Sequence, residues 1–154
     1  MEREDYKLYL GTDHRGFELK ERIKEKLKNH GYIYEDLGAY EYNPNDDYTD
    51  IAIKLGEEVS KNIKNRGIIF CGSGVGVCIA VNKVKGIRAA LGEEIEIVKK
   101  AREDDDINVL CIPADFVNED KAFALIEIFL NTPFKNQEKY IRRIKKIEEY
   151  ENLN

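Results

Sequence analysis

A cysteine directly before a glycine-rich segment is the feature of this sequence best suited to chemistry. Cys71 follows residues 68–70 (IIF), an apolar run of the kind that forms buried strands. Residues 72–76 (GSGVG) come next, and residues 77–82 are expected to continue as a helix. Glycines let the backbone turn sharply and direct several N–H groups at one point, which is how anion-binding loops are built. The segment therefore predicts an anion-binding loop with a thiol at its edge.

The placement of Cys71 at a helix start favours ionisation of its thiol. A helix N-terminus is partly positive, so it should lower the pKa of the thiol from its usual value of about 8.5. Cys71 would then serve as a base near neutral pH. The alternative is a buried structural cysteine beside glycines that only make the turn, but the coincidence of strand end, thiol and glycine loop favours function. The loop matches neither the Walker pattern nor the dinucleotide fingerprint GxGxxG.

A second polar loop, residues 12–16 (TDHRG), separates an expected strand from an expected helix. In an open parallel sheet such loops lie at the carboxyl ends of the strands, where ligands bind. We therefore expect Asp13 and His14 to lie on the same side of the sheet as Cys71. Asp13 is also suited to cap the helix that follows, and it can do both.

Strand and helix patterns alternate along the whole chain, with short connections and no repeat or linker. This order predicts one α/β domain over residues 1–154, a three-layer sandwich around a mostly parallel five-stranded sheet. The expected strands are residues 7–10, 32–36, 68–71, 86–91 and 108–112. The expected helices are residues 17–27, 51–63, 77–82, 95–101, 122–130 and 141–150, and residues 38–50 are expected to form a polar loop without regular structure.

Composition excludes several classes of function. The 154 residues include 25 basic and 30 acidic side chains, and the net charge of -5 argues against nucleic acid as a partner. No apolar run approaches the ~20 residues that span a bilayer, and the first residues do not resemble a signal peptide, so we expect a cytoplasmic protein that does not bind membranes. The three cysteines show no CxxC spacing, so neither a disulfide framework nor a zinc site is indicated. We expect no metal and no cofactor.

Several segments resemble the type B ribose-5-phosphate isomerase family, which includes the two galactose-6-phosphate isomerase subunits. They are GTDHRGFELK, the CGSGVG loop running into IAVNKVKGIRAA, INVLCIPA, a TPF segment and a terminal RRI helix. The resemblance covers nearly the whole chain. It implies a Rossmann-like fold, metal-free interconversion of an aldose phosphate and a ketose phosphate, and a dimer whose two sites take residues from both chains. The C-terminal helix would extend to the partner subunit.

The resemblance also implies roles for residues in the first half of the site. Cys71 matches the base that moves a proton between two sugar carbons, and this agrees with the chemistry of the loop, since isomerisation needs a base and donors aimed at the oxygen where charge develops. The other matches are Ser73, which orients the thiol, the amides of Gly72, Gly74 and Gly76, Asp13 and His14 at the substrate's oxygens, and the ring of Tyr48.

The second half of the site departs from the family pattern. Asp104 stands where the family has the ring-opening histidine, and Asp105 stands where it has an asparagine. Asp104 could still act as a proton shuttle, but adjacent acids also suit a solvated helix end. Asp115 occupies the position of an expected arginine. Residues 136–140 (NQEKY) replace the family's glycine-glycine-arginine-histidine stretch, which leaves Lys139 and Arg143 as the cations expected to bind phosphate.

The favoured function is therefore a sugar-phosphate isomerase of the ribose 5-phosphate to ribulose 5-phosphate type, as in the pentose phosphate pathway. Two alternatives stay open. One is a galactose-6-phosphate isomerase B-type subunit that needs a partner chain, and the other is a non-catalytic module that binds a sugar phosphate. The expected assembly is a homodimer or tetramer, or a heteromer with a related subunit.

Overall fold

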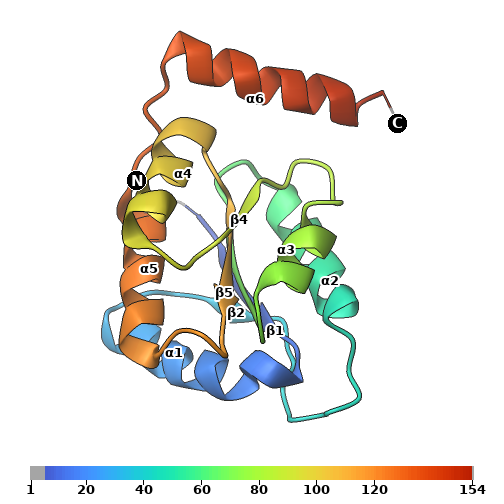
Figure 1. The fold of residues 1–154 in the computed structure, drawn as a ribbon, viewed down its shortest axis with the longest axis vertical. Coiled ribbons are helices and arrows are strands. Elements are labelled where there is room, and N and C mark those ends of the chain that lie inside the picture. Colours follow the sequence, from blue (N-terminus) through green and yellow to red (C-terminus); the bar gives the residue numbers. More distant parts are fainter. Residues whose placement is uncertain (1–5, 154) are drawn as a thin grey trace.

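A five-stranded sheet lies between two layers of helices in the computed structural model, which describes residues 6–153 (Figure 1). Residues 1–5 and 154 of the predicted domain lie outside that range. The strands are β1 (Leu8–Thr12), β2 (Glu35–Asp36), β3 (Arg66–Cys71), β4 (Ala89–Leu91) and β5 (Val109–Pro113). The helices are α1 (Phe17–Asn29), α2 (Tyr48–Ser60), α3 (Val75–Val81), α4 (Ile95–Asp105), α5 (Glu119–Asn131) and α6 (Glu138–Glu151). Within residues 6–153, no helix has the length and apolar character needed to cross a bilayer.

The strands run in the order β2-β1-β3-β5-β4, and every neighbouring pair is parallel. The predicted α/β fold with a five-stranded sheet is confirmed. Side chains of the central strand β3 alternate between two cores: Ile68 and Phe70 pack on the side of α1 and α5, while Ile69 and Cys71 pack on the side of α2 and α3. Because helices cover both faces of the sheet, β3 is buried along its whole length, as parallel strands usually are.

Helix α2 begins earlier than the sequence pattern indicates. The prediction of a loop through residue 50 is wrong for its last three residues, because α2 starts at Tyr48 with Asp47 as its N-cap residue in an extended conformation. The first turn of α2 is solvent-exposed, so it carries no apolar periodicity that would reveal it. Tyr48 is thereby held at the start of a helix rather than in an irregular loop.

The carboxyl ends of three strands meet at one edge of the sheet. Thr12 of β1 pairs with Phe70 of β3, and Cys71 of β3 pairs with Pro113 of β5. The connections that follow these strands therefore meet at this edge. This arrangement places Asp13 and His14 on the same side of the sheet as Cys71.

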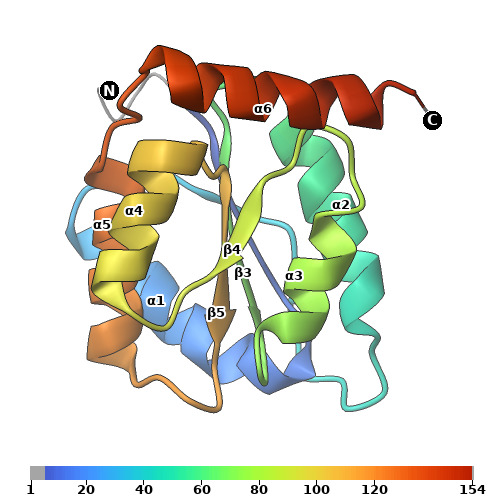
Figure 2. The same cartoon turned by 45° about the horizontal axis from the view of Figure 1, so that its top comes forward.

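Helix α6 lies across the opposite edge of the sheet, above the amino-terminal ends of the strands (Figure 2). None of its residues is buried, and it contacts α4. The extension of this helix to a partner subunit remains a prediction.

Candidate active site

Cys71 is the last residue of β3, and its thiol faces the start of α3. The residue is 5% exposed, and the amide N–H of Gly74 donates a hydrogen bond to its Sγ atom at 3.2 Å. Gly74 has a left-handed backbone with φ of 75°, a conformation that glycine adopts without strain. That turn brings the amide back to the sulfur before the helix begins. The thiol and loop therefore have the arrangement that the sequence predicts.

The pKa of Cys71 nevertheless shifts in the direction opposite to the expected one. Burial raises the pKa of the thiol above its ordinary value of 9.0 and outweighs the amides of Val77, Gly74 and Gly76, which act to lower it. The nearby Asp13 carboxylate raises it further. The expectation of a lowered pKa is wrong because the cost of placing charge in a buried site exceeds what a short helix start offsets. In the free chain the protonated thiol predominates at neutral pH.

A cavity of about 400 Å³ opens beside Cys71 at the carboxyl edge of the sheet. It brings together most of the first half of the predicted site, although its residues come from three separate connections and the start of α2. Its lining consists of Asp13, Arg15, Tyr48, Cys71, Gly72, Ser73, Gly76, Asp115 and Phe116. We call this space the thiol cavity. Arg15 and Asp115, which sequence reasoning did not place among the site residues, are part of its wall.

Asp13 both caps a turn and lines the thiol cavity. Its Oδ1 atom accepts hydrogen bonds from the amides of Arg15 at 3.0 Å and Gly16 at 3.3 Å, and so caps the 3₁₀ turn His14–Gly16. Asp13 therefore caps this short turn and not α1 as predicted, since the N-cap residue of α1 is Gly16. Burial raises the pKa of the carboxyl group above its ordinary value of 3.8 in spite of the two amides.

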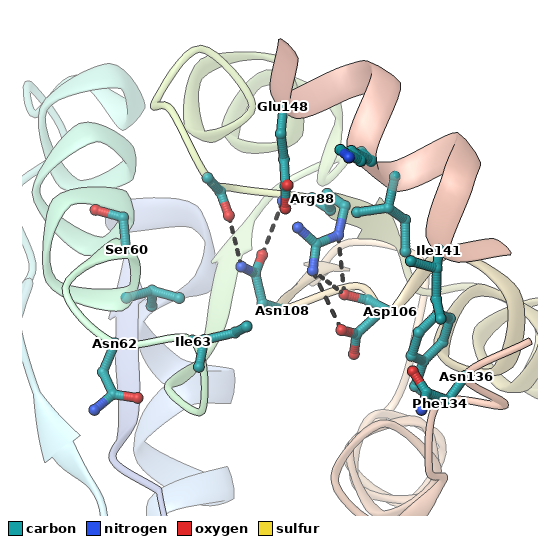
Figure 3. A pocket seen from close by; sticks show the side chains of 14 residues that line it. Ser60, Asn62, Ile63, Arg88, Asp106, Asn108, Phe134, Asn136, Ile141 and Glu148 are labelled. Atoms are coloured by element: carbon teal, nitrogen blue, oxygen red, sulfur yellow. Dashed lines mark hydrogen bonds and ion pairs between the residues drawn. The ribbon is translucent and has the colours of Figure 1, made fainter. Parts of the chain in front are cut away.

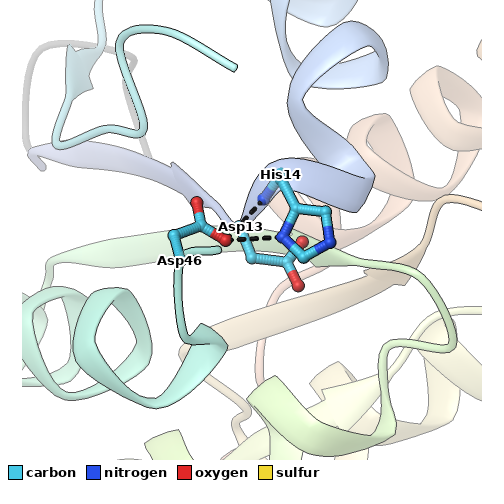
Figure 4. A group of neighbouring side chains, drawn as sticks. All are labelled: Asp13, His14 and Asp46. Atoms are coloured by element: carbon cyan, nitrogen blue, oxygen red, sulfur yellow. Dashed lines mark hydrogen bonds and ion pairs between the residues drawn. The ribbon is translucent and has the colours of Figure 1, made fainter. Parts of the chain in front are cut away.

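His14 is held by Asp46, as Figure 4 shows. Its Nδ1 atom lies 2.6 Å from Asp46 Oδ1, and its backbone amide donates to the same oxygen at 3.0 Å. A carboxylate only accepts, so Nδ1 carries the shared proton and Nε2 is left available to a ligand. His14 lines a neighbouring cavity of about 530 Å³, with Phe17 and Tyr42 among its other walls, rather than the thiol cavity. Sequence reasoning missed Asp46, because it lies 32 residues away in a polar loop without a motif.

Asp13, His14 and Asp46 are the one group in residues 6–153 whose side chains could together hold a metal ion, with ligand atoms within 4.8 Å of one another. Each already has a partner. Asp46 accepts from the imidazole, and Asp13 accepts from two backbone amides. The group is thus satisfied by internal hydrogen bonds without requiring an ion.

Comparison with known proteins identifies the family. A family model described as Ribose/Galactose Isomerase matches residues 8–147. The chain belongs to this family. It is 40% identical over 147 residues to the probable ribose-5-phosphate isomerase B of Mycoplasma genitalium, covering 95% of this chain and 96% of that protein. The crystal structure of ribose-5-phosphate isomerase B from M. genitalium with bound ribulose-5-phosphate aligns with a TM-score of 0.93 at 39% identity, over 97% of this chain and 99% of that one.

Ribose-5-phosphate isomerase B of Mycobacterium tuberculosis is 37% identical over 145 residues, which cover 94% of this chain and 90% of that protein. The resemblance stated from the sequence motifs is confirmed. The chain is a sugar-phosphate isomerase.

The second half of the predicted site lies away from the thiol, at the amino-terminal edge of the sheet. Asp104 and Asp105 are the last residues of α4, which leads into the amino end of β5, whereas Cys71 pairs with the carboxyl end of β5. Asp104 Oδ1 is buried and has no hydrogen-bond partner within the described chain. Lys139 and Arg143 lie on α6, where both cations are near the Tyr140 ring. A single chain therefore does not bring these four residues to the thiol.

A cavity of about 590 Å³ lies beneath α6, at this amino-terminal edge of the isomerase (Figure 3). Its polar groups bond to one another: Arg88 donates to the Asp106 carbonyl at 2.8 and 3.1 Å, and Asn108 donates to the Gly86 carbonyl at 2.8 Å. These contacts tie the loop after α4 to the segment before β4. Neither Lys139 nor Arg143 lines the cavity.

Proposed function

We propose that this isomerase interconverts ribose 5-phosphate and ribulose 5-phosphate, with Cys71 as the base. The observation that carries the proposal is a thiol at the edge of a glycine loop, inside a cavity that also contains Asp13, Ser73 and Tyr48. The relative from M. genitalium, crystallised with ribulose-5-phosphate, aligns over almost the whole chain and supports this substrate.

In the proposed reaction the Cys71 thiolate takes the proton from C2 of the open-chain aldose. The electrons of the C–H bond form the C1–C2 double bond of an enediolate, and negative charge develops on the sugar oxygens. The Ser73 hydroxyl and the amides of the glycine loop stabilise that charge. The C1=O π electrons pass to O1, which takes up the proton of the C2 hydroxyl group. As the thiol returns its proton to C1, the C1–C2 double bond breaks and the C2 carbonyl forms, so atoms and electrons balance without an external oxidant. A raised pKa makes the thiolate scarce at neutral pH, but it makes the thiolate a stronger base.

The remaining steps are assigned to the distant residues of a second chain. Asp104 would open the sugar ring, assisted by Asp105, while Lys139 and Arg143 would bind the phosphate. Their position at the far edge of the sheet favours a site completed by a partner subunit. The reaction requires no metal, so we expect activity to survive treatment with EDTA, and its loss, restored by added metal, would contradict the metal-free mechanism.

The test compares Cys71→Ala with Cys78→Ala as a matched control. Cys78 is a cysteine of α3 that does not line the thiol cavity. With ribose 5-phosphate, Cys71→Ala should lower kcat by about 10²- to 10⁴-fold, the usual contribution of a positioned base, while Cys78→Ala should remain near wild type.

Other outcomes separate the alternatives. Binding of ribose 5-phosphate without turnover by any of the proteins would favour the non-catalytic module. Turnover of galactose 6-phosphate alone, appearing only when a related subunit is added, would favour the paired-subunit alternative. Equal activity of Cys71→Ala and wild type would exclude the thiol as the base.

A further inference from the structure

Arg15 carries the one positive charge among the described residues that line the thiol cavity. Two carboxyl groups, those of Asp13 and Asp115, line the same space. Without Arg15, their charges would face an incoming sugar phosphate unopposed and would repel it. The cations assigned from the family pattern do not offset them within the chain, because they lie on α6. Arg15 is thus the group in the chain that can make the cavity acceptable to an anion.

The Arg15 guanidinium forms an ion pair with Asp115, a residue 100 positions away in the chain. The pair lies directly over Gly72: a Cβ atom on that glycine would be 2.6 Å from Arg15 Nε and 2.8 Å from Asp115 Oδ2. The amide of Asp115 donates to the Gly72 carbonyl at 3.0 Å, which fixes the carboxylate there. The guanidinium is therefore held beside the residue that follows the thiol.

The ion pair is accessible to solvent and can be exchanged at little cost. The side chains of Arg15 and Asp115 are 58% and 37% exposed, and ion pairs this exposed to solvent contribute little to stability. Arg15 also borders the neighbouring cavity, but Glu18 and Glu21 line that space and add negative charge. An anion held by Arg15 is consequently favoured on the side of the thiol cavity.

We propose that Arg15 is a substrate-binding residue that takes the phosphate dianion of the sugar in place of Asp115, alongside the α6 cations that a second chain would supply. A guanidinium matches phosphate oxygens in a bidentate geometry, and the hydrogen bonds are charge-assisted. Asp115 positions Arg15 before the sugar phosphate binds and competes with the phosphate for the guanidinium. The identity of the sugar rests on the proposed function, whereas the binding of an anion at Arg15 can be measured without turnover.

The experiment measures the Kd of inorganic phosphate by calorimetry and the KM for ribose 5-phosphate on the full-length protein. Arg15→Gln should raise both by about ten- to a hundredfold, the range expected for a lost hydrogen bond to a charged group, with kcat little changed. Asp115→Asn should lower both, because it removes the competing charge while preserving the shape of the side chain. Arg22→Gln is the matched control, since Arg22 is 57% exposed in an ion pair with Glu18 and does not line the thiol cavity.

Three results would overturn the proposal. Arg15→Gln and wild type could bind phosphate equally or not measurably, Asp115→Asn could weaken binding as much as Arg15→Gln does, or the loss in Arg15→Gln could fall on kcat with KM unchanged. If Arg15→Gln does not fold, Arg15→Lys is the second variant, because it retains the positive charge but lacks the paired N–H donors of the guanidinium. Its Kd for phosphate should rise less than that of Arg15→Gln. Wild-type affinity in Arg15→Lys would exclude bidentate binding. Phosphate binding without turnover of ribose 5-phosphate would refute the proposed function but leave the Arg15 assignment standing.

Discussion

Burial and hydrogen bonding act on the Cys71 thiol in opposite directions, and burial dominates. The consequence is a specific pH dependence. The base must lose its proton before it can act, and its pKa lies above 9.0 in the free chain, so the fraction of active thiolate grows as pH rises. We predict that kcat/KM for ribose 5-phosphate is still increasing at pH 9. A rate profile that becomes flat near neutral pH would show that another group, or a partner subunit, sets the pKa of the base.

Alkylation by iodoacetamide gives an independent reading of the same pKa. The experiment needs the Cys78→Ala background, because the Cys111 thiol and the Asn82 amide hold the pKa of Cys78 down at about 7, so this half-buried thiol would react first. Cys111 is fully buried, and its pKa is raised well above the ordinary value by burial. In that background, the alkylation rate should increase with pH and still be increasing at pH 9, and it should vanish in the Cys71→Ala, Cys78→Ala double variant.

Asp46 is predicted to position His14. Asp46→Ala removes the acceptor for both the imidazole and the backbone amide, so kcat/KM should fall by about tenfold, within the range for a lost charge-assisted hydrogen bond. Asp46→Asn keeps an oxygen acceptor, so its kcat/KM should fall less than that of Asp46→Ala. Nitrogen NMR of the imidazole should show a change in tautomer in Asp46→Ala, which a general loss of stability would not produce. Asp47→Asn is the control, because Asp47 is exposed and makes no side-chain cap.

At the scale of elements, a buried ion pair ties α1 to β2. Lys20 is fully buried, and its Nζ atom donates to Asp36 at 2.6 Å and to the Ala39 carbonyl at 2.8 Å. Asp36→Asn should lower the free energy of unfolding by up to about 3–5 kcal/mol, because it removes the nearer counter-charge of a buried ammonium and leaves the more distant Glu21, whose Oε1 atom lies 3.6 Å from Lys20 Nζ. Glu18→Gln, which breaks an exposed pair with Arg22, should cost at most about 1 kcal/mol. Urea titrations at one protein concentration measure both.

The same ion pair predicts how the difference in unfolding free energy between wild type and Asp36→Asn depends on pH. Burial by itself would raise the pKa of Asp36, but hydrogen bonds from Lys20, Lys24 and the Gly38 amide outweigh it and leave the pKa below 3.8. A carboxyl group with a lowered pKa stabilises the fold fully above its unfolded pKa, and the stabilisation is lost as pH falls through the folded value. The gap between wild type and Asp36→Asn should therefore persist at neutral pH and shrink below pH 3.8. A gap independent of pH would mean that packing, not charge, causes the loss.

The sequence predicts best what is encoded locally. The order of strands and helices and the loop from Cys71 to Val75 could be predicted because apolar runs and glycines signal them within a few residues. Contacts between distant segments could not be predicted in this way, and they include the pairing of His14 with Asp46 and of Arg15 with Asp115. The direction of the Cys71 pKa shift could not be predicted from the sequence either, because it depends on how deeply the fold buries the thiol and not only on the helix start beside it.

At the scale of the whole molecule, the sheet separates two sets of charged residues. The thiol cavity lies at the carboxyl edge, while Asp104 lies at the end of α4 that leads into the amino-terminal end of β5. Helix α6, which carries the cations, crosses the amino-terminal edge (Figure 2). A strand of five residues spans roughly 17 Å, which is more than a lysine or arginine side chain can bridge across the sheet. The residues assigned from the family pattern can therefore meet a thiol only if it belongs to another chain. Helix α6, with no buried residue, is free to make such a contact.

This separation predicts that two defective variants complement each other. Cys71→Ala lacks the base, and a Lys139→Ala, Arg143→Ala double variant lacks the cations of α6. In a mixed dimer, one of the two sites would combine the intact thiol of one chain with the intact cations of the other. After unfolding and refolding an equimolar mixture, half of the dimers are mixed, so about a quarter of the wild-type activity should return at substrate concentrations below KM. Each variant refolded alone is the control. A mixture that gives only the average of the two variants would mean that the cations and the thiol of a working site belong to the same chain, or that α6 has no part in it.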